Sequence, residues 1–479
     1  MKKTDKKLGL WLLVSVAVGS MIGSGIFNSP KDLISVANPQ GVMLTWLVGG
    51  FGALMLALVF TYLASRKPEL KSGIYAYAHD GFGDYMGFNS AWGYWSMGWL
   101  GTASYLIFFF KTLNDLLGVN ALSPLTCFLI GSGVLWFFYA ILLVGVKEGA
   151  ILNFVVTIAK LLPIVLIIVL GLSLINIDIF RVENWQFELA ATSESTTPFL
   201  QVRHAMAIVL WCFVGIEAAS VLSGRSRNQK TVRVATIISV LIVLGIYMLL
   251  TFITMSSVPA IELAASETPL ALVLGKTIIG TSGAAIIKIG IMVSVLGASL
   301  SWILLSVETM YAAAKDGVMP RFLAKVNAKG TPTNALLLTQ GFTQLFLLAI
   351  LSPKMNNTYL AAITIATTLV LIPYLLSSLY AVKISIINRK IESPVHLTIA
   401  LLGSIYATYV IYAVGLKYLF FSIVFYGIGS LLFLKAKREK NEQPKRWEWV
   451  VMGVLICVAL VILVLIVSGK IELYKQLEK

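Results

Sequence analysis

Long apolar segments alternate with short polar connections along the whole chain. Thirteen segments are apolar and long enough to form helices that cross a bilayer. They cover residues 8–37, 42–64, 86–110, 124–146, 149–176, 198–222, 232–255, 283–314, 334–352, 358–384, 396–415, 418–434 and 448–469. The pattern predicts an all-α integral membrane protein with about 13 transmembrane helices. Of all residues, 58% are hydrophobic and 12% charged, which excludes an ordinary soluble domain.

Basic residues gather in every second connection, as in residues 2–7, 66–71 and 225–233. The other connections are poor in Lys and Arg and hold acids such as Asp178 and Glu262. Because positive connections stay in the cytoplasm, we expect a cytoplasmic N-terminus and a retained first helix. The net charge of +15 therefore reflects membrane topology, and we expect no nucleic-acid partner.

Residues 19–27, reading GSMIGSGIF, interrupt the first apolar segment with three glycines and two serines. Such a stretch is poor material for a continuous helix. A helix broken at mid-membrane exposes amide groups on one side and carbonyls on the other, and these ends bind a small zwitterion. The alternative is that Gly19 and Gly23 only let two helices pack closely.

The sixth apolar segment carries a second interruption, WCFVGIEAAS, with Gly215 and Glu217 at mid-membrane. It lies five segments after the first. Corresponding interruptions in two five-helix halves indicate an inverted-repeat transporter with its site between the breaks. We expect the first repeat at 1–176, the second at 177–384, and three further helices with a tail at 385–479. An intramembrane carboxylate makes Glu217 a functional candidate, although a structural hydrogen-bonding role is the alternative.

The catalytic classes find no support in the chain. There is no Ser/His/Asp grouping, no metal-ligand spacing and no phosphate-binding loop. The cysteines Cys127, Cys212 and Cys457 lie in separate apolar segments, and we expect free thiols. We therefore expect neither an enzyme nor a cofactor or metal.

Several motifs together resemble the amino acid–polyamine–organocation (APC) superfamily: GSGIF, SGIYAYAHDGFG, WCFVGIEAASV, LSWILLSVETMYAAAKDG and the Pro373-Tyr374 pair. The chain is most similar to its basic amino acid/polyamine antiporters, and SRKPEL, GFGDYMGF and SAWGYW resemble the arginine/ornithine antiporters. The resemblance implies the five-plus-five (5+5) inverted-repeat APC-type fold, with helices 1 and 6 unwound around the substrate. It also implies a bacterial cell (inner) membrane protein, as a monomer or homodimer.

The resemblance also implies how a substrate is bound. Its carboxylate would meet the amides near Ser24 and Gly25. Its α-ammonium would meet the carbonyls of Met21, Trp211 and Val214.

In related arginine/agmatine exchangers a guanidinium stacks on an aromatic of helix 6 and is covered by a tryptophan of helix 8. Those positions correspond to Trp211 and Trp302, and such cation–π contacts contribute roughly 0.5–2 kcal/mol. Packing alone is the alternative role for Trp302. Thr102 replaces an asparagine of those exchangers and Ala366 a serine, so this end of the pocket has been rebuilt.

The same exchangers close their inner gate with two phenols and a carboxylate, which correspond to Tyr94, Tyr374 and Glu217. Lys160, about a dozen residues into the fifth segment, resembles the lysine of proton-coupled relatives that replaces a sodium ion between helices 1 and 8. A structural ammonium that ties helices together is the alternative.

The chain is thus expected to be a membrane antiporter that exchanges cationic amino acids, arginine for ornithine, by alternating access. Other functions on the same scaffold are amino acid/amine exchange (histidine/histamine, agmatine/putrescine or lysine/cadaverine), proton-coupled uptake, which Lys160 would serve, and nutrient sensing without flux. Its partners would be small amino acids or amines and the lipid bilayer.

Overall fold

The structure, a computed structural model, describes residues 7–118, 121–187, 196–351, 355–391 and 393–468. Within these residues the regular elements are helices, and β-pairing is limited to two isolated bridges. Each of the thirteen predicted apolar segments coincides with a long helix or with a helix interrupted by a short break. The prediction of an all-α membrane protein is confirmed in that coarse form.

The first half of the chain contains the first broken helix and the long helix α5. Its α-helices are α1 (Leu10–Met21), α2 (Ser24–Ile34), α3 (Pro39–Arg66), α4 (Ile74–Phe82), α5 (Asp84–Leu117), α6 (Pro124–Val144), α7 (Val146–Gly171) and α8 (Ile177–Phe180). Two 3₁₀ turns follow α7 and α8, η1 (Leu172–Leu174) and η2 (Glu183–Trp185).

The second half begins with the second broken helix. Its α-helices are α9 (Pro198–Phe213), α10 (Ala218–Val221), α11 (Gln229–Ser257), α12 (Ala260–Ala265), α13 (Pro269–Gly275), α14 (Gly280–Lys315), α15 (Thr333–Leu347), α16 (Met355–Ile387), α17 (Pro394–Val414), α18 (Leu416–Glu439) and α19 (Arg446–Val467). The 3₁₀ turns are η3 (Leu222–Arg225), η4 (Arg321–Ala324) and η5 (Leu348–Leu351).

Eleven helices in the described residues are long and apolar enough to cross a membrane, and twelve when the bent pair formed by α9 and residues 218–225 counts as one span. The exception among the predicted segments is α5, which is long but less apolar. It carries many glycine, serine, tyrosine and tryptophan residues because it is packed on most sides by protein, where lipid-facing hydrophobicity is not required. The predicted number of thirteen spans therefore depends on α5.

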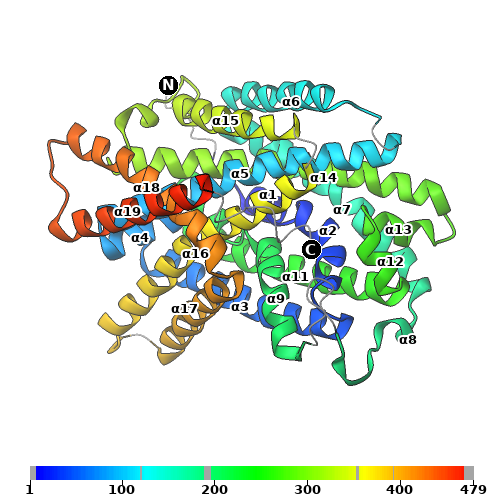
Figure 1. The fold of residues 1–479 in the computed structure, drawn as a ribbon. Helices are drawn as coiled ribbons and strands as arrows, with labels where there is room; N and C mark the ends of the chain where they lie inside the picture. Colours follow the sequence, from blue (N-terminus) through cyan, green and yellow to red (C-terminus); the bar gives the residue numbers. More distant parts are fainter. Residues whose placement is uncertain (1–6, 119–120, 188–195, 352–354, 392, 469–479) are drawn as a thin grey trace.

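Helices α5 and α14 run side by side through the middle of the molecule (Figure 1). Helix α16 covers α5, and α7 packs against α14. On the other side, α3 and α11 pack together and carry the broken helices, α9 against α3 and α1 against α11. The breaks of both helices are thereby held at the buried centre of the bundle.

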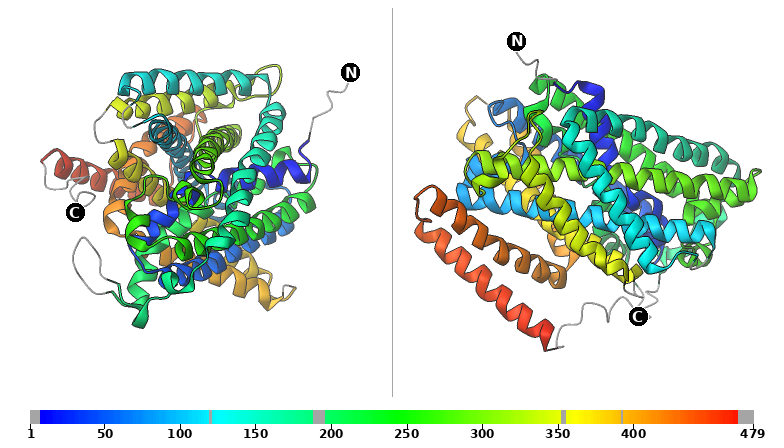
Figure 2. Two further views of the ribbon diagram at one scale, coloured as in Figure 1. Left: turned by 90° about the vertical axis from the view of Figure 1, so that its right-hand side faces the viewer. Right: turned by 90° about the horizontal axis from the view of Figure 1, so that it is seen from above.

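The last helices lie at the edge of this bundle. Helices α18 and α19 pack on each other at one margin of the molecule (Figure 2). They have a small apolar cluster of their own, formed by Val424, Ala459 and Ile462. The final helix therefore packs away from the two broken helices.

Backbone pairing joins the start of α1 to the segment that follows the second broken helix. The Leu8 amide donates to the Arg225 carbonyl at 2.8 Å, and the Arg227 amide donates to the Leu8 carbonyl at 3.1 Å. The Arg225 guanidinium also forms an ion pair with Glu308 of α14 at 2.9 Å. Three segments far apart in the sequence are thus tied at the end of the bundle that carries the N-terminus.

Candidate functional site

The first broken helix is interrupted at Ile22 and Gly23, between the end of α1 at Met21 and the start of α2 at Ser24. The break lies inside the predicted stretch 19–27. A helix end leaves its last carbonyls without intrahelical partners. Here the Lys160 ammonium donates to the carbonyls of Gly19 at 2.7 Å and Ile22 at 2.8 Å. Its side chain is fully buried.

Other hydrogen-bond donors from α7 and α14 also contact the carbonyls of α1 and of the first break. The Ser294 hydroxyl of α14 donates to the Ile22 carbonyl at 3.1 Å. On α7, Asn153 and Thr157 both donate to the Ser15 carbonyl at 3.2 Å. The C-terminal end of α1 carries a partial negative charge. A cation and neutral donors therefore hold that end between α7 and α14.

The glycines of the first break serve both of the roles considered from the sequence. A carbon at the Cβ position of Gly19 would lie 2.8 Å from the Thr157 hydroxyl oxygen, so α1 approaches α7 too closely for a side chain there. At Gly23 the same carbon would lie 2.7 Å from the Tyr105 ring. Gly19 thus permits close packing, while Gly23 lies in the break itself.

The second broken helix is interrupted between Phe213 and Ala218, and its two parts differ in direction by 40°. Gly215 has a φ of +119°, which favours glycine. A Cβ on Gly215 would lie 2.4 Å from the Ser20 hydroxyl oxygen, so the two breaks approach each other directly.

Tyr247 of α11 connects the carbonyls of the two breaks. Its hydroxyl is placed to donate to the Met21 carbonyl at 2.7 Å and the Cys212 carbonyl at 3.0 Å. The ring is fully buried. Each carbonyl keeps a second lone pair, so the Met21 carbonyl retains the capacity to accept from a bound cation.

Glu217 is the last residue of the second break and is fully buried. Its carboxylate accepts from the Tyr94 hydroxyl at 2.7 Å, from the Tyr374 hydroxyl, and from the Gly215 amide at 3.2 Å. The three residues that the sequence analysis grouped as a gate come from α5, the second break and α16. The structure brings them into one hydrogen-bonded cluster.

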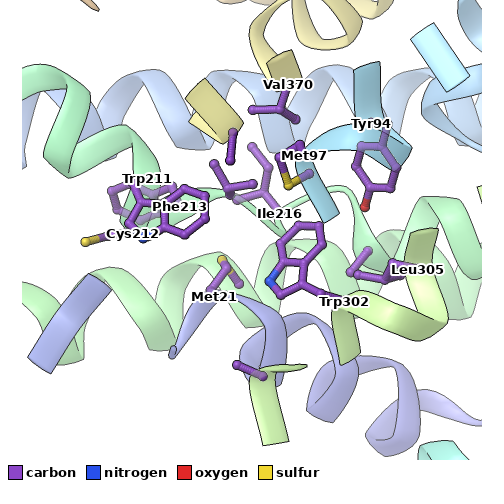
Figure 3. Close-up of a cluster of buried hydrophobic side chains, with 14 of the residues drawn as sticks. Met21, Tyr94, Met97, Trp211, Cys212, Phe213, Ile216, Trp302, Leu305 and Val370 are labelled. Atoms are coloured by element: carbon purple, nitrogen blue, oxygen red, sulfur yellow. The ribbon is translucent and has the colours of Figure 1, made fainter. Parts of the chain in front are cut away.

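Aromatic side chains surround the breaks on both sides. Figure 3 shows Met21, Trp211, Ile216 and Trp302 within one buried cluster. The Trp302 indole donates to the Ser20 carbonyl at 3.2 Å, which directs this side chain toward the first break.

Trp211 lies at the other side of the first break. A carbon at the Cβ position of Gly25 would lie 3.1 Å from its ring, and the ring packs near Tyr105 at a centroid distance of 6.1 Å. A carbon at the Cβ position of Gly101, the neighbour of Thr102, would lie 3.4 Å from the far edge of the same ring. The Thr102 hydroxyl donates to the Gly98 carbonyl of its own helix at 2.9 Å.

Sequence reasoning missed the tyrosines that complete the site. Tyr247 joins the two breaks, and the Tyr359 hydroxyl donates to the Ser24 hydroxyl at 3.0 Å. Both lie in strongly apolar segments, where an isolated tyrosine gives no signal that separates a site residue from a packing residue. Ser294 and Asn153 were missed for the same reason.

Two interrupted helices that face each other within a bundle of apolar helices define a polytopic membrane protein with a buried, polar central site. Profile comparison makes this more specific: the amino acid permease family matches residues 8–417. The chain belongs to this family.

Individual relatives match nearly the full length of the chain. It is 38% identical to the arginine/ornithine antiporter of Pseudomonas aeruginosa, over 92% of this chain and 93% of that protein. It is 34% identical to a putative arginine/ornithine antiporter of Escherichia coli, over 94% and 97% of the two chains. The arginine/ornithine antiporter of Latilactobacillus sakei is 32% identical, over 98% and 99%.

Proposed function

We propose that this protein is an antiporter that exchanges arginine for ornithine across the bacterial inner membrane by alternating access. The observation that carries the proposal is the meeting of the two helix breaks, whose carbonyls share the Tyr247 hydroxyl. Such paired helix ends suit a zwitterionic amino acid. The names of the full-length relatives supply the substrate pair.

The proposed fold is a 5+5 inverted repeat that comprises residues 1–176 and 177–384, followed by three further helices. Helix packing supports it. If each helix of the first half is matched with the helix five spans later, the packing of α1 on α11 corresponds to that of α9 on α3. The packing of α5 on α16 likewise corresponds to that of α14 on α7.

In this fold α5 is the third of thirteen spans. With the basic connections inside, the N-terminus and the backbone pairing of Leu8 lie in the cytoplasm.

A bound arginine would place its carboxylate at the amides of Ser24 and Gly25 and its α-ammonium at the carbonyls of Met21, Trp211 and Val214. The side chain would then extend between Trp211 and Trp302, over Thr102. Cation–π attraction suits a delocalised guanidinium. The hydrogen-bonded cluster of Tyr94, Glu217 and Tyr374 would close the path between this site and the cytoplasm.

The proposed exchange moves no net charge because one monocation replaces another. The membrane potential should therefore neither drive nor oppose it. Proteoliposomes preloaded with ornithine should take up labelled arginine rapidly, whereas empty vesicles should not. A panel of unlabelled amino acids and amines then shows which counter-substrate supports the fastest uptake. Equal uptake into empty and preloaded vesicles would contradict exchange and indicate uniport or symport.

Trp302→Leu tests the aromatic cover of the side chain. The substitution keeps apolar bulk but removes the π face, so apparent affinity for arginine should weaken by roughly two- to thirtyfold, as expected for the loss of about 0.5–2 kcal/mol. Half-saturating concentrations in the exchange assay measure the effect. Trp99→Leu is the matched control, since Trp99 is a buried tryptophan of α5 that packs against Phe342, Phe346 and Phe425. An unchanged affinity in Trp302→Leu would assign Trp302 to packing.

A further inference from the structure

A polar stripe runs along α2 from the first break toward the end of the bundle opposite the N-terminus. Ser24, Asn28 and Asp32 are spaced four residues apart, so they share one face of the helix, with about 6 Å between successive positions along its axis. Ser24 begins the stripe at the break, where it contacts Tyr359. The stripe thus leads outward from the candidate substrate site.

Asp32 carries the only acidic side chain of this stripe and is partly buried. Its carboxylate accepts from the Asn28 amide nitrogen at 2.7 Å. It also interacts electrostatically with the lysines Lys31 and Lys111. Cys212 of α9 and Tyr359 of α16 lie within electrostatic range of it as well. Because these residues come from helices around the breaks, Asp32 faces the interior of the bundle.

Five other charged residues at this end of the bundle form ion pairs with one another. Glu267 forms ion pairs with Lys31 at 2.9 Å and with Lys111. Asp115 pairs with Lys288 at 2.9 Å. Within the part of the chain that the structure describes, Asp32 alone among these acids lacks an ion pair within 4.0 Å.

Asn28 supplies a second observation. Its side chain is 2% exposed, and its amide oxygen Oδ1 is buried without a hydrogen-bond partner among the described residues. A buried acceptor without a donor is unfavourable and rare in native proteins. The amide oxygen of Asn28 and the two carboxylate oxygens of Asp32 therefore form a cluster of acceptors that has no ion pair with a cation among the described residues.

We propose that Asp32 and Asn28 form an outer recognition site for the cationic side chain of the incoming substrate, one to two helical turns before the break. The inference rests on the proposed exchange of cationic amino acids and adds a residue pair that selects for charge. A guanidinium has five N–H donors and no acceptor, and it pairs with a carboxylate through two parallel bonds. An amino acid with a neutral side chain would gain nothing from Asp32.

The test compares arginine with citrulline, which has the same shape at its side-chain end but no charge. In Asp32→Asn, the external arginine concentration for half-maximal exchange should rise by roughly tenfold to a hundredfold, the effect of losing a hydrogen bond to a charged group. Competition by citrulline should stay as in the wild type. Asp32→Glu keeps the charge and should retain most of the preference for arginine.

Asp115→Asn is the matched control, because it neutralises an ion-paired carboxylate at the same end of the bundle. It should leave the preference for arginine over citrulline unchanged; a loss equal to that of Asp32→Asn would overturn the proposal in favour of a general charge effect. If Asp32→Asn does not transport, calorimetric titration of the purified variant gives the ratio of its affinities for arginine and citrulline. If this ratio is the same in Asp32→Asn as in the wild type, the proposed outer site is wrong. Absence of arginine exchange in the wild type would instead refute the proposed function.

Discussion

Lys160→Met is expected to abolish exchange while the protein still folds. The substitution keeps most of the side-chain volume but removes the donor to the carbonyls of Gly19 and Ile22. Hydrogen bonds from a charged group contribute about 1.5–3 kcal/mol each. Without them, the negative end of α1 is held only by neutral donors such as Ser294. Exchange should fall by at least about a hundredfold in proteoliposomes.

The same geometry predicts that the wild type is independent of sodium. The ammonium already supplies a positive charge between α1, α7 and α14, so exchange rates in sodium, potassium and choline buffers should be equal. Lys288→Met is the matched control, because Lys288 is a partly buried lysine that pairs with Asp115 away from the breaks. Gel filtration reports folding of each variant. Normal exchange by Lys160→Met with an unchanged pH profile would reduce Lys160 to a packing role.

Glu217→Ala is expected to produce the second large loss. Three buried donors, the hydroxyls of Tyr94 and Tyr374 and the Gly215 amide, lose their acceptor together. Each unsatisfied buried donor costs about 1–3 kcal/mol. Both the exchange rate and the melting temperature of the purified protein should therefore decrease. Glu217→Gln should be milder because its amide retains one acceptor oxygen and can donate to a phenol.

Single tyrosine variants separate a gate from a structural cluster. Tyr374→Phe and Tyr94→Phe each remove one bond to Glu217 and keep the ring. A gate predicts altered exchange rates with nearly normal melting temperatures, whereas a purely structural cluster predicts the reverse. Tyr406→Phe controls for the substitution itself, since the buried Tyr406 hydroxyl has no hydrogen-bond partner among the described residues. Wild-type rates in both Tyr94→Phe and Tyr374→Phe would count against a gate.

Much of this arrangement could be predicted from the sequence because its signals are local. The glycine-rich interruption at 19–27, the glycine and acid of 211–220, and rare intramembrane charges such as Lys160 stand out against an apolar background. Lys160 donates to the carbonyls of Gly19 and Ile22 at the first break, while its role in place of a sodium ion stays a prediction. The number of spans was less predictable, because the composition of α5 reflects burial by protein rather than contact with lipid.

The remaining parts of the site depend on how distant helices meet. Nothing in residues 232–255 distinguishes Tyr247 from a packing tyrosine, since its role arises only where the carbonyls of Met21 and Cys212 converge. In the sequence, the stripe that includes Asn28 and Asp32 resembles an ordinary helix end. Its role depends on tertiary contacts, because lysines at the same end of the bundle form ion pairs with other acids. Such roles are properties of tertiary contact and have no local sequence signal.

The pairing of Leu8 with Arg225 and Arg227 uses main-chain atoms on both sides. Replacement of either arginine by alanine would leave both bonds in place, so alanine scanning would not detect this backbone pairing. Substitutions at these positions would also preserve the two bonds, because the bonds do not depend on which side chains the positions carry. Only a change to the backbone would break a bond, such as proline at position 227, which lacks the donating amide. Whatever motion opens the N-terminal end of the bundle must either break these two bonds or carry both segments together.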